Sequence, residues 1–244
     1  MALDRSGNAL RAAAASAGPD AKVPTCPAWD VTKLVIHQGM VHRWAAANLR
    51  GDTAHDTSAS KTEARAAADL LAWYSAGLAA LVDTVEQTAD DAKAPVFLND
   101  APPPRRFWAR RQAHETTIHS VDAVSAVHGR WPTASEVEID AALAADGIDE
   151  LLTGFVTRGK GKLHSAEPYT MVVRATDTGH AWTVRIGDGP IVTTLGDIAR
   201  PDAVLSGAAA QLYLSLWNRA DEMTTEGRDD IVGQWRSQIR IRWS

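Results

Sequence analysis

Residues 110–123 read RRQAHETTIHSVDA and place the carboxylate of Glu115 four positions before the imidazole of His119. Side chains at i and i+4 lie on one face of an α-helix, so the two groups can reach a single ion. Ala113 and Ile118 belong to the same, largely apolar helix. A charged group on such a helix must reach water or find a partner such as a metal. The segment therefore indicates a helix that carries two metal ligands.

The histidines of this segment do not form the zinc-protease signature H-E-x-x-H. His114 and His119 are five positions apart, one more than the signature allows. Successive residues turn by about 100° around a helix, so these two side chains diverge by about 140° and cannot face the same ion. The usable pair is Glu115 with His119, and His114 lies beside it.

An ordinary ion pair is the alternative interpretation of Glu115. Arg111 lies four positions earlier, and an exposed Arg–Glu pair at this spacing stabilises a helix by about 0.2–0.5 kcal/mol without any further role. Spacing alone leaves both interpretations open. A metal site would also require a third ligand from another element.

The first half of the chain carries the signals of a helical bundle. Gly18 followed by proline ends an alanine-rich segment, Asp30 is suited to cap the next helix, and Gly129 ends the helix that contains Glu115. Long helices with these breaks favour a four-helix bundle, in which facing side chains commonly build metal sites. The expected helices cover residues 3–17, 31–49, 61–88 and about 105–128.

His37 is the candidate for the third ligand. It lies one turn before Val41 on the apolar stripe of the helix expected at 31–49, so its imidazole should face the interior. His42 is five positions from His37, and only one of the two should point towards the site. The pattern therefore predicts a ligand set of His37, Glu115 and His119.

The second half of the chain changes to an α+β pattern. Strand-like runs follow a helix and a Gly-Lys-Gly-Lys connector at 159–162, which reads as flexible. We therefore predict a bundle over residues 1–132 and a smaller α+β domain over residues 133–244. The expected helices are 136–156, 207–218 and a last one containing Ile231, Trp235 and Ile239; the expected strands are 169–174, 180–186, 190–194 and 203–205.

Composition limits the classes of function. The chain has 244 residues, a net charge of −5 and 45% hydrophobic residues, which is ordinary for a globular protein and gives no sign of nucleic-acid binding. No apolar run approaches the roughly 20 residues of a membrane span, and no signal segment is evident at the N-terminus. We expect a cytoplasmic protein without membrane partners. Cys26 is the single cysteine, so an internal disulfide is excluded.

The motifs around these residues resemble the mycothiol-dependent maleylpyruvate isomerase family. This family belongs to the DinB-like metalloenzymes, in which a four-helix bundle holds a divalent metal, and its C-terminal domain resembles sterol-carrier proteins. The resemblance implies an α+β fold with a DinB-like bundle followed by a smaller sterol-carrier-like domain. The segments that carry it are 23–29, 34–37, 41–45, 109–123, 202–207 and 212–219.

The resemblance also implies the site and its cofactors. The metal ligands would be His37, Glu115 and His119, the set that the spacing indicates, with a position left open for substrate or water. Zinc suits these ligands best, and nickel or ferrous iron are alternatives. Mycothiol would supply a thiol for cis–trans isomerisation by thiolate addition and elimination. No protein cysteine is needed, so Cys26 is expected to be buried and inert.

Three further residues have competing interpretations. Arg219 is the candidate to stabilise an enolate, or it satisfies carbonyl groups at the end of a helix. His42 is a candidate to act beside the open metal position, or it packs at the end of the bundle. Asp122, one turn after His119, either accepts a hydrogen bond from that ligand or faces solvent.

Other functions share this ligand set. A mycothiol S-transferase would use the same thiol to attack an electrophile, and non-haem iron oxygenases also use two histidines and a carboxylate. A non-catalytic ligand-binding protein with a structural metal is the alternative from another class. Structural zinc usually has four protein ligands, whereas this chain offers three good ones, which favours catalysis.

Overall fold

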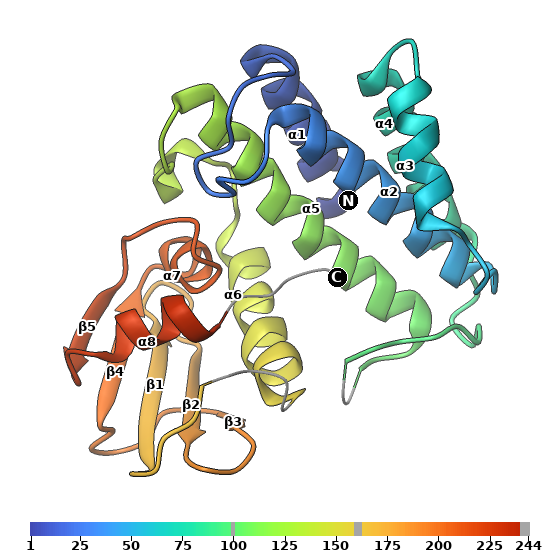
Figure 1. The fold of residues 1–244 in the computed structure, drawn as a ribbon. Helices are drawn as coiled ribbons and strands as arrows, with labels where there is room; N and C mark the ends of the chain where they lie inside the picture. The colour runs from blue at the N-terminus through green and yellow to red at the C-terminus, as the bar shows by residue number, and fades with distance from the viewer. Residues whose placement is uncertain (99–100, 159–162, 240–244) are drawn as a thin grey trace. The chain divides into compact units, whose positions relative to one another are not determined.

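The computed structural model describes residues 1–98, 101–158 and 163–239. Within them the chain divides into two compact units. The first consists of residues 1–97 and 101–132, and the second of Leu98 with the described residues from Thr133 onward. The first unit is helical and the second contains the sheet (Figure 1).

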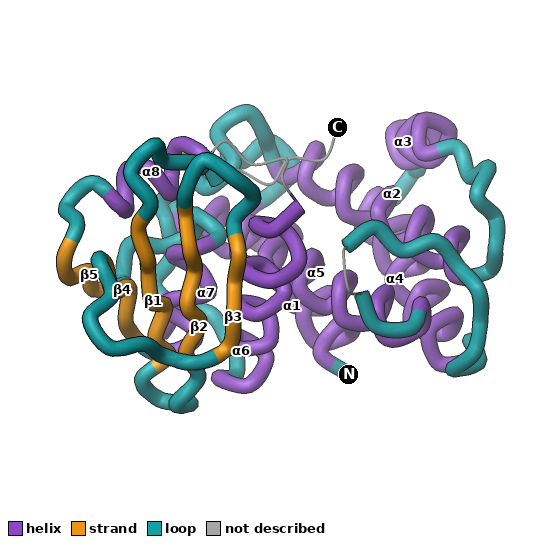
Figure 2. The backbone as a smooth tube through the Cα atoms, turned by 90° about the horizontal axis from the view of Figure 1, so that it is seen from below, coloured by secondary structure: helices purple, strands orange, loops and turns teal. Residues whose placement is uncertain are grey.

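Four long helices and one short helix build the first unit. Helix α1 packs along α5, and α2 packs against α4, while the short α3 lies against α2 (Figures 1 and 2). The expected α+β class with an N-terminal bundle is confirmed. The helices are α1 Ala2–Ala17, α2 Val31–Leu49, α3 Thr57–Ala66, α4 Leu70–Gln87 and α5 Pro104–His128.

The capping residues place two of these helices as expected. The Asp30 side chain accepts a hydrogen bond from the backbone N–H of Lys33, which satisfies a free donor at the start of α2. Helix α5 begins with Pro104 at its first position, where a missing N–H costs nothing. It ends at Gly129 in the left-handed conformation, φ 66°.

The prediction of a single helix over residues 61–88 is wrong. The chain forms α3 and α4 instead, because Asp69 caps a new helix by accepting from the N–H of Ala72. Ala67 before it is extended, with φ −65° and ψ 131°. The first of the two helices also begins earlier than expected, at Thr57, with Asp56 as its cap.

The second unit is a five-stranded sheet with helices. Its strand order is β3-β2-β1-β4-β5, in which β1 and β4 are parallel and the other neighbours antiparallel. The strands are β1 Tyr169–Ala175, β2 Ala181–Ile186, β3 Val192–Leu195, β4 Ala203–Gly207 and β5 Thr224–Gly227. The helical segments are η1 Ala134–Glu136, α6 Ala141–Asp149, the π-helix η2 Glu150–Phe155, η3 Val156–Arg158, α7 Ala209–Leu216 and α8 Ile231–Gln238.

Two expectations for this unit need correction. The helix expected from residue 136 begins at Ala141, because Asp140 caps it by accepting from the N–H of Leu143. Strand β5 was not predicted, since its four residues are all exposed and show no apolar alternation. The four expected strands and the last helix are confirmed within one or two residues at most ends. The connector expected at 159–162 lies outside the described residues.

Among the described residues, no helix has both the length and the apolar character that crossing a bilayer requires.

Candidate metal centre

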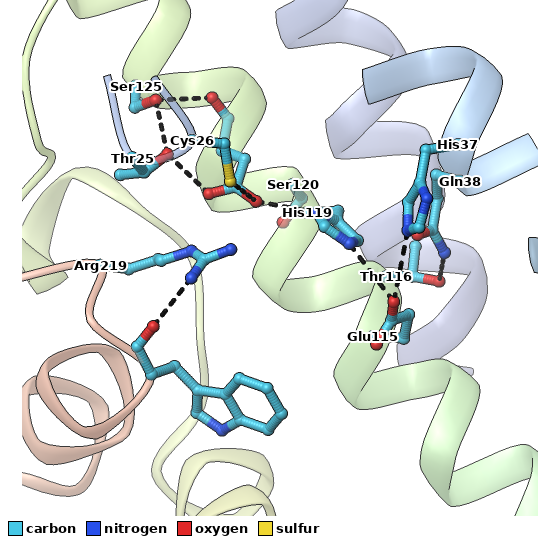
Figure 3. A network of polar contacts seen from close by, with 12 residues as sticks. Thr25, Cys26, His37, Gln38, Glu115, Thr116, His119, Ser120, Ser125 and Arg219 are labelled. Carbon is cyan, nitrogen blue, oxygen red and sulfur yellow. Dashed lines mark hydrogen bonds and ion pairs between the residues drawn. The ribbon is translucent and has the colours of Figure 1, made fainter. Parts of the chain in front are cut away.

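Helices α2 and α5 bring His37, Glu115 and His119 together in the bundle (Figure 3). The Oε1 atom of Glu115 lies 3.3 Å from Nε2 of His119 and 3.7 Å from Nε2 of His37. One donor atom from each residue lies within 4.8 Å of the other two. The three residues predicted from spacing therefore converge, and in the described part of the chain they form the group suited to a metal.

The unsatisfied atoms of this group fit a divalent ion. Nε2 of His37 and Oε1 of Glu115 are buried and have no hydrogen-bond partner, a costly state unless another group completes them. Ligand atoms about 2.0–2.1 Å from a tetrahedral zinc are about 3.3–3.4 Å apart, close to both distances from Oε1. Two imidazoles and one carboxylate would leave a fourth position for an exogenous ligand.

Asp122 orients one of the imidazoles. Its Oδ2 lies 2.8 Å from Nδ1 of His119, and its side chain is fully buried. A carboxylate accepts, so Nδ1 carries a proton, and in the neutral imidazole the lone pair of Nε2 is directed at the metal position. Thr25 donates to the other oxygen, Oδ1, at 2.6 Å. Of the two interpretations of Asp122, the hydrogen bond to the ligand is the one observed.

Replacing Asp122 with Asn should weaken metal binding by about 10–100-fold, since partners of metal-bound histidines contribute at this level. The amide can present its N–H₂ group to Nδ1 and favour the wrong tautomer of His119. Competition with a chromophoric chelator measures the affinity. Asp146→Asn, in the second unit, is the matched control. Equal affinity in Asp122→Asn and wild type would contradict this role.

The ion pair between Arg111 and Glu115 is buried, so the alternative interpretation of an exposed surface pair is wrong. Its side chain is completely buried, and Nη2 lies 3.0 Å from Oε2 of Glu115. Helix α5 packs against α1 and α2, and most of its side chains between Phe107 and Ala126 are buried. Spacing along a sequence does not reveal how many sides of a helix are covered. The pair belongs to the interior.

The loop before α2 supplies two residues that the sequence did not reveal as functional. The Trp29 ring centroid lies 4.8 Å from that of His37 and stacks on His119 at 5.7 Å. The indole is partly buried and lies against both imidazoles on one side. Thr25 contacts Asp122 as described. Only the resemblance drew attention to this loop, because a loop has no periodicity that predicts which way its side chains face.

Cys26 is partly exposed rather than buried as expected. The loop carries its Sγ to 3.5 Å from Oδ2 of Asp122, the oxygen that also accepts from His119 (Figure 3).

The charges of the ligand group stabilise one another. Burial alone would raise the pKa of Glu115, but the interactions with His119, His37 and Arg111 outweigh it and lower the pKa well below the usual value. Burial opposes protonation of His119 as well, yet Asp122 and Glu115 together raise its pKa to about 9. Burial lowers the pKa of His37. Glu115 is therefore ionised, and His37 is the more readily available neutral donor.

His42 lies outside the ligand group, in the bundle interior. Its Nε2 atom is 2.9 Å from both Nε2 of Gln38 and Oγ1 of Thr116, and its ring packs against Tyr74. The side chain is fully buried, and burial lowers its pKa to about 3. This environment is that of the packing alternative for His42, in which the neutral imidazole is part of the core.

The lowered pKa of His42 predicts loss of stability in acid. Between about pH 6.5 and 3 the unfolded chain binds a proton that the native His42 does not. The free energy of unfolding therefore falls with decreasing pH, by up to about 1.4 kcal/mol per unit. Urea unfolding of metal-free His42→Gln across this window should show a shallower slope than wild type. The exposed His164→Gln is the control, and identical slopes for all three proteins would refute the prediction.

Arg219 belongs to the second unit and follows α7 in a tight turn. Its backbone N–H donates to the Leu214 carbonyl at 2.8 Å, and Nη1 donates to the carbonyl of Trp217 at 2.9 Å. Asn218 between them has a left-handed conformation, φ 59°. The hydrogen bond to Trp217 is what the helix-end alternative requires, and the catalytic role of Arg219 stays a prediction.

Comparisons with known families match both units. The model of the mycothiol maleylpyruvate isomerase N-terminal domain matches residues 1–124, and that of the MDMPI C-terminal domain matches residues 142–235. A search of curated proteins gave no match.

Solved structures with a similar fold include two of mycothiol-dependent maleylpyruvate isomerase. One is a crystal structure of this isomerase, with 16% sequence identity and a TM-score of 0.54. The other is a histidine-to-alanine mutant of it, with 14% identity and a TM-score of 0.55. Each alignment covers 91% of this chain and 92% of the other. At this identity the likeness concerns the fold.

Proposed function

Because the chain belongs to the mycothiol maleylpyruvate isomerase family, we propose that it is a metal-dependent enzyme that isomerises a cis alkene conjugated with carbonyl groups, with mycothiol as the thiol cofactor. The observation that carries the proposal is the convergence of His37, Glu115 and His119 with two buried ligand atoms that have no partner. Zinc is the first candidate for the ion, since two imidazoles and one carboxylate suit it.

The chemistry follows from an activated thiol. A divalent metal in this site would lower the pKa of a thiol and so provide a thiolate at neutral pH. Addition of such a thiolate to one alkene carbon would move the π electrons to a carbonyl oxygen and leave a single bond about which the molecule could rotate. Expulsion of the thiolate would then give the trans alkene. The thiol is regenerated, and no external oxidant or reductant is needed.

The residues of the chain have separate tasks in this proposal. His37 and His119 donate as neutral ligands and Glu115 contributes one negative charge, so a divalent ion would keep a net positive charge. Asp122 holds the proton on Nδ1 of His119. Trp29 covers the imidazoles on one side and limits the access of water. Arg219 is proposed to bind the developing negative charge of the enolate.

The test combines metal analysis with a thiol-dependent assay. Purified protein loaded with zinc, nickel or ferrous iron should convert maleylpyruvate to its trans isomer only when mycothiol is present, and chelation should abolish the reaction. Consumption of mycothiol with a covalent adduct as the product would instead indicate an S-transferase. Isomerisation at the same rate without thiol or metal would refute the proposal.

A further inference from the structure

The two carboxylate oxygens of Glu115 have different surroundings. Oε2 lies 3.0 Å from Nη2 of Arg111. Oε1 has no hydrogen-bond partner and is the oxygen nearest to the Nε2 atoms of both His37 and His119. One oxygen is therefore held by a guanidinium, and the other is directed at the metal position.

Arg111 is placed to maintain this division. It lies one turn before Glu115 on α5, so the helix backbone fixes the distance between the two residues. Its side chain is completely buried, and a buried guanidinium loses hydration that its charge partners must offset. A planar guanidinium also directs its N–H donors at carboxylate oxygens, which an ammonium group does not.

A carboxylate can bind a metal through one oxygen or through both. Bidentate binding by Glu115 would add a fourth protein donor atom to the three described above. That atom would compete for the position that an exogenous ligand needs, because a catalytic zinc site has three protein ligands and one open position.

We propose that Arg111 is a positioning residue that restricts Glu115 to one-oxygen ligation and thereby keeps a coordination position open for the sulfur of the thiol. The inference rests on the proposed function for the identity of that exogenous ligand. Its geometric part, the use of a single oxygen of Glu115, concerns the metal alone.

Cobalt substitution tests both parts without an activity assay. We would prepare cobalt-loaded wild type, Arg111→Lys and Arg111→Met, with Arg106→Met as the matched control, an exposed arginine on the same helix. Visible d–d bands report coordination number, since four-coordinate cobalt absorbs more strongly than five- or six-coordinate cobalt. Titration with 2-mercaptoethanol follows the sulfur-to-cobalt charge-transfer band near the ultraviolet.

Both Arg111 variants should keep cobalt but show d–d bands that differ from wild type: weaker where the second oxygen of Glu115 adds to the exogenous ligand, and shifted in wavelength where it replaces that ligand. The thiol concentration that gives half of the maximal charge-transfer intensity should also be about 10–100-fold higher than in wild type. This is the range expected for a residue that supports a metal ligand. Arg111→Lys should show the smaller change because it keeps the charge. If Arg111→Met does not fold, circular dichroism will show it, and Arg111→Lys then decides. Arg106→Met should match wild type.

Each contrary result has a distinct meaning. Wild-type d–d bands and thiol binding in the folded Arg111 variants would overturn the inference. Loss of cobalt from folded Arg111→Lys would overturn it too, because Arg111 would then retain the metal rather than keep a position open. A wild type without any thiol band would refute the thiol part and the proposed function together, while the d–d comparison would still decide how Glu115 binds.

Discussion

His119→Ala should leave the folded protein without its divalent ion and without isomerase activity. The substitution removes one of three ligands, and the two that remain cannot enclose an ion. It also leaves Oδ2 of Asp122 without the His119 hydrogen bond in a buried position, which we expect to cost about 1–3 kcal/mol of unfolding free energy. The bundle should still fold, because apolar burial between its helices supplies most of its stability.

Metal analysis on protein of verified fold measures this effect. Wild type should hold one ion per chain, and His119→Ala should retain less than about a tenth of it after dialysis against a weak chelator, a limit that reflects the loss of an entire ligand. His128→Ala is the matched control, since His128 is an exposed histidine on the same helix. Full metal stoichiometry in His119→Ala would show that the ion binds elsewhere, and the proposed ligand set would be wrong.

The sequence was most informative where a single side chain determines a local structure. Asp30 and Gly129 mark helix ends through hydrogen bonds and backbone angles that depend only on their neighbours, so the start of α2 and the end of α5 were placed almost to the residue. The i and i+4 rule then aligned Glu115 with His119. The break between α3 and α4 was missed because it lies in an alanine-rich run, and alanine is the strongest helix former, so the pattern favours an unbroken helix.

Features that depend on tertiary packing were not predictable from spacing. The pattern could not show that Arg111 is buried, since the burial comes from helices far away in the sequence. Trp29 and Thr25 reach the site because the loop before α2 lies against α5, and no short-range signal specifies that path. The ligands themselves could be inferred, whereas the residues that orient them required the structure.

Arg219→Lys should lower kcat by about 10²–10³-fold while leaving metal content and thermal stability close to wild type. The substitution keeps the positive charge but removes the planar pair of donors that would bind a carboxylate or enolate, and loss of a donor to a developing oxyanion has effects of this size. An interaction made only in the transition state lowers kcat and kcat/KM equally. A loss of substrate binding alone would raise KM.

The helix-end alternative for Arg219 predicts a different set of results. If the guanidinium only donates to the Trp217 carbonyl, Arg219→Ala should lower the unfolding temperature and leave turnover unchanged. Arg185→Lys, an exposed arginine of β2, controls for the general effect of an Arg-to-Lys change in the same unit. Near-normal turnover in both Arg219→Lys and Arg219→Ala would remove Arg219 from the mechanism. The cation for the enolate would then have to be sought in the bundle, where the metal is the first candidate and the buried Arg111 is already bound to Glu115.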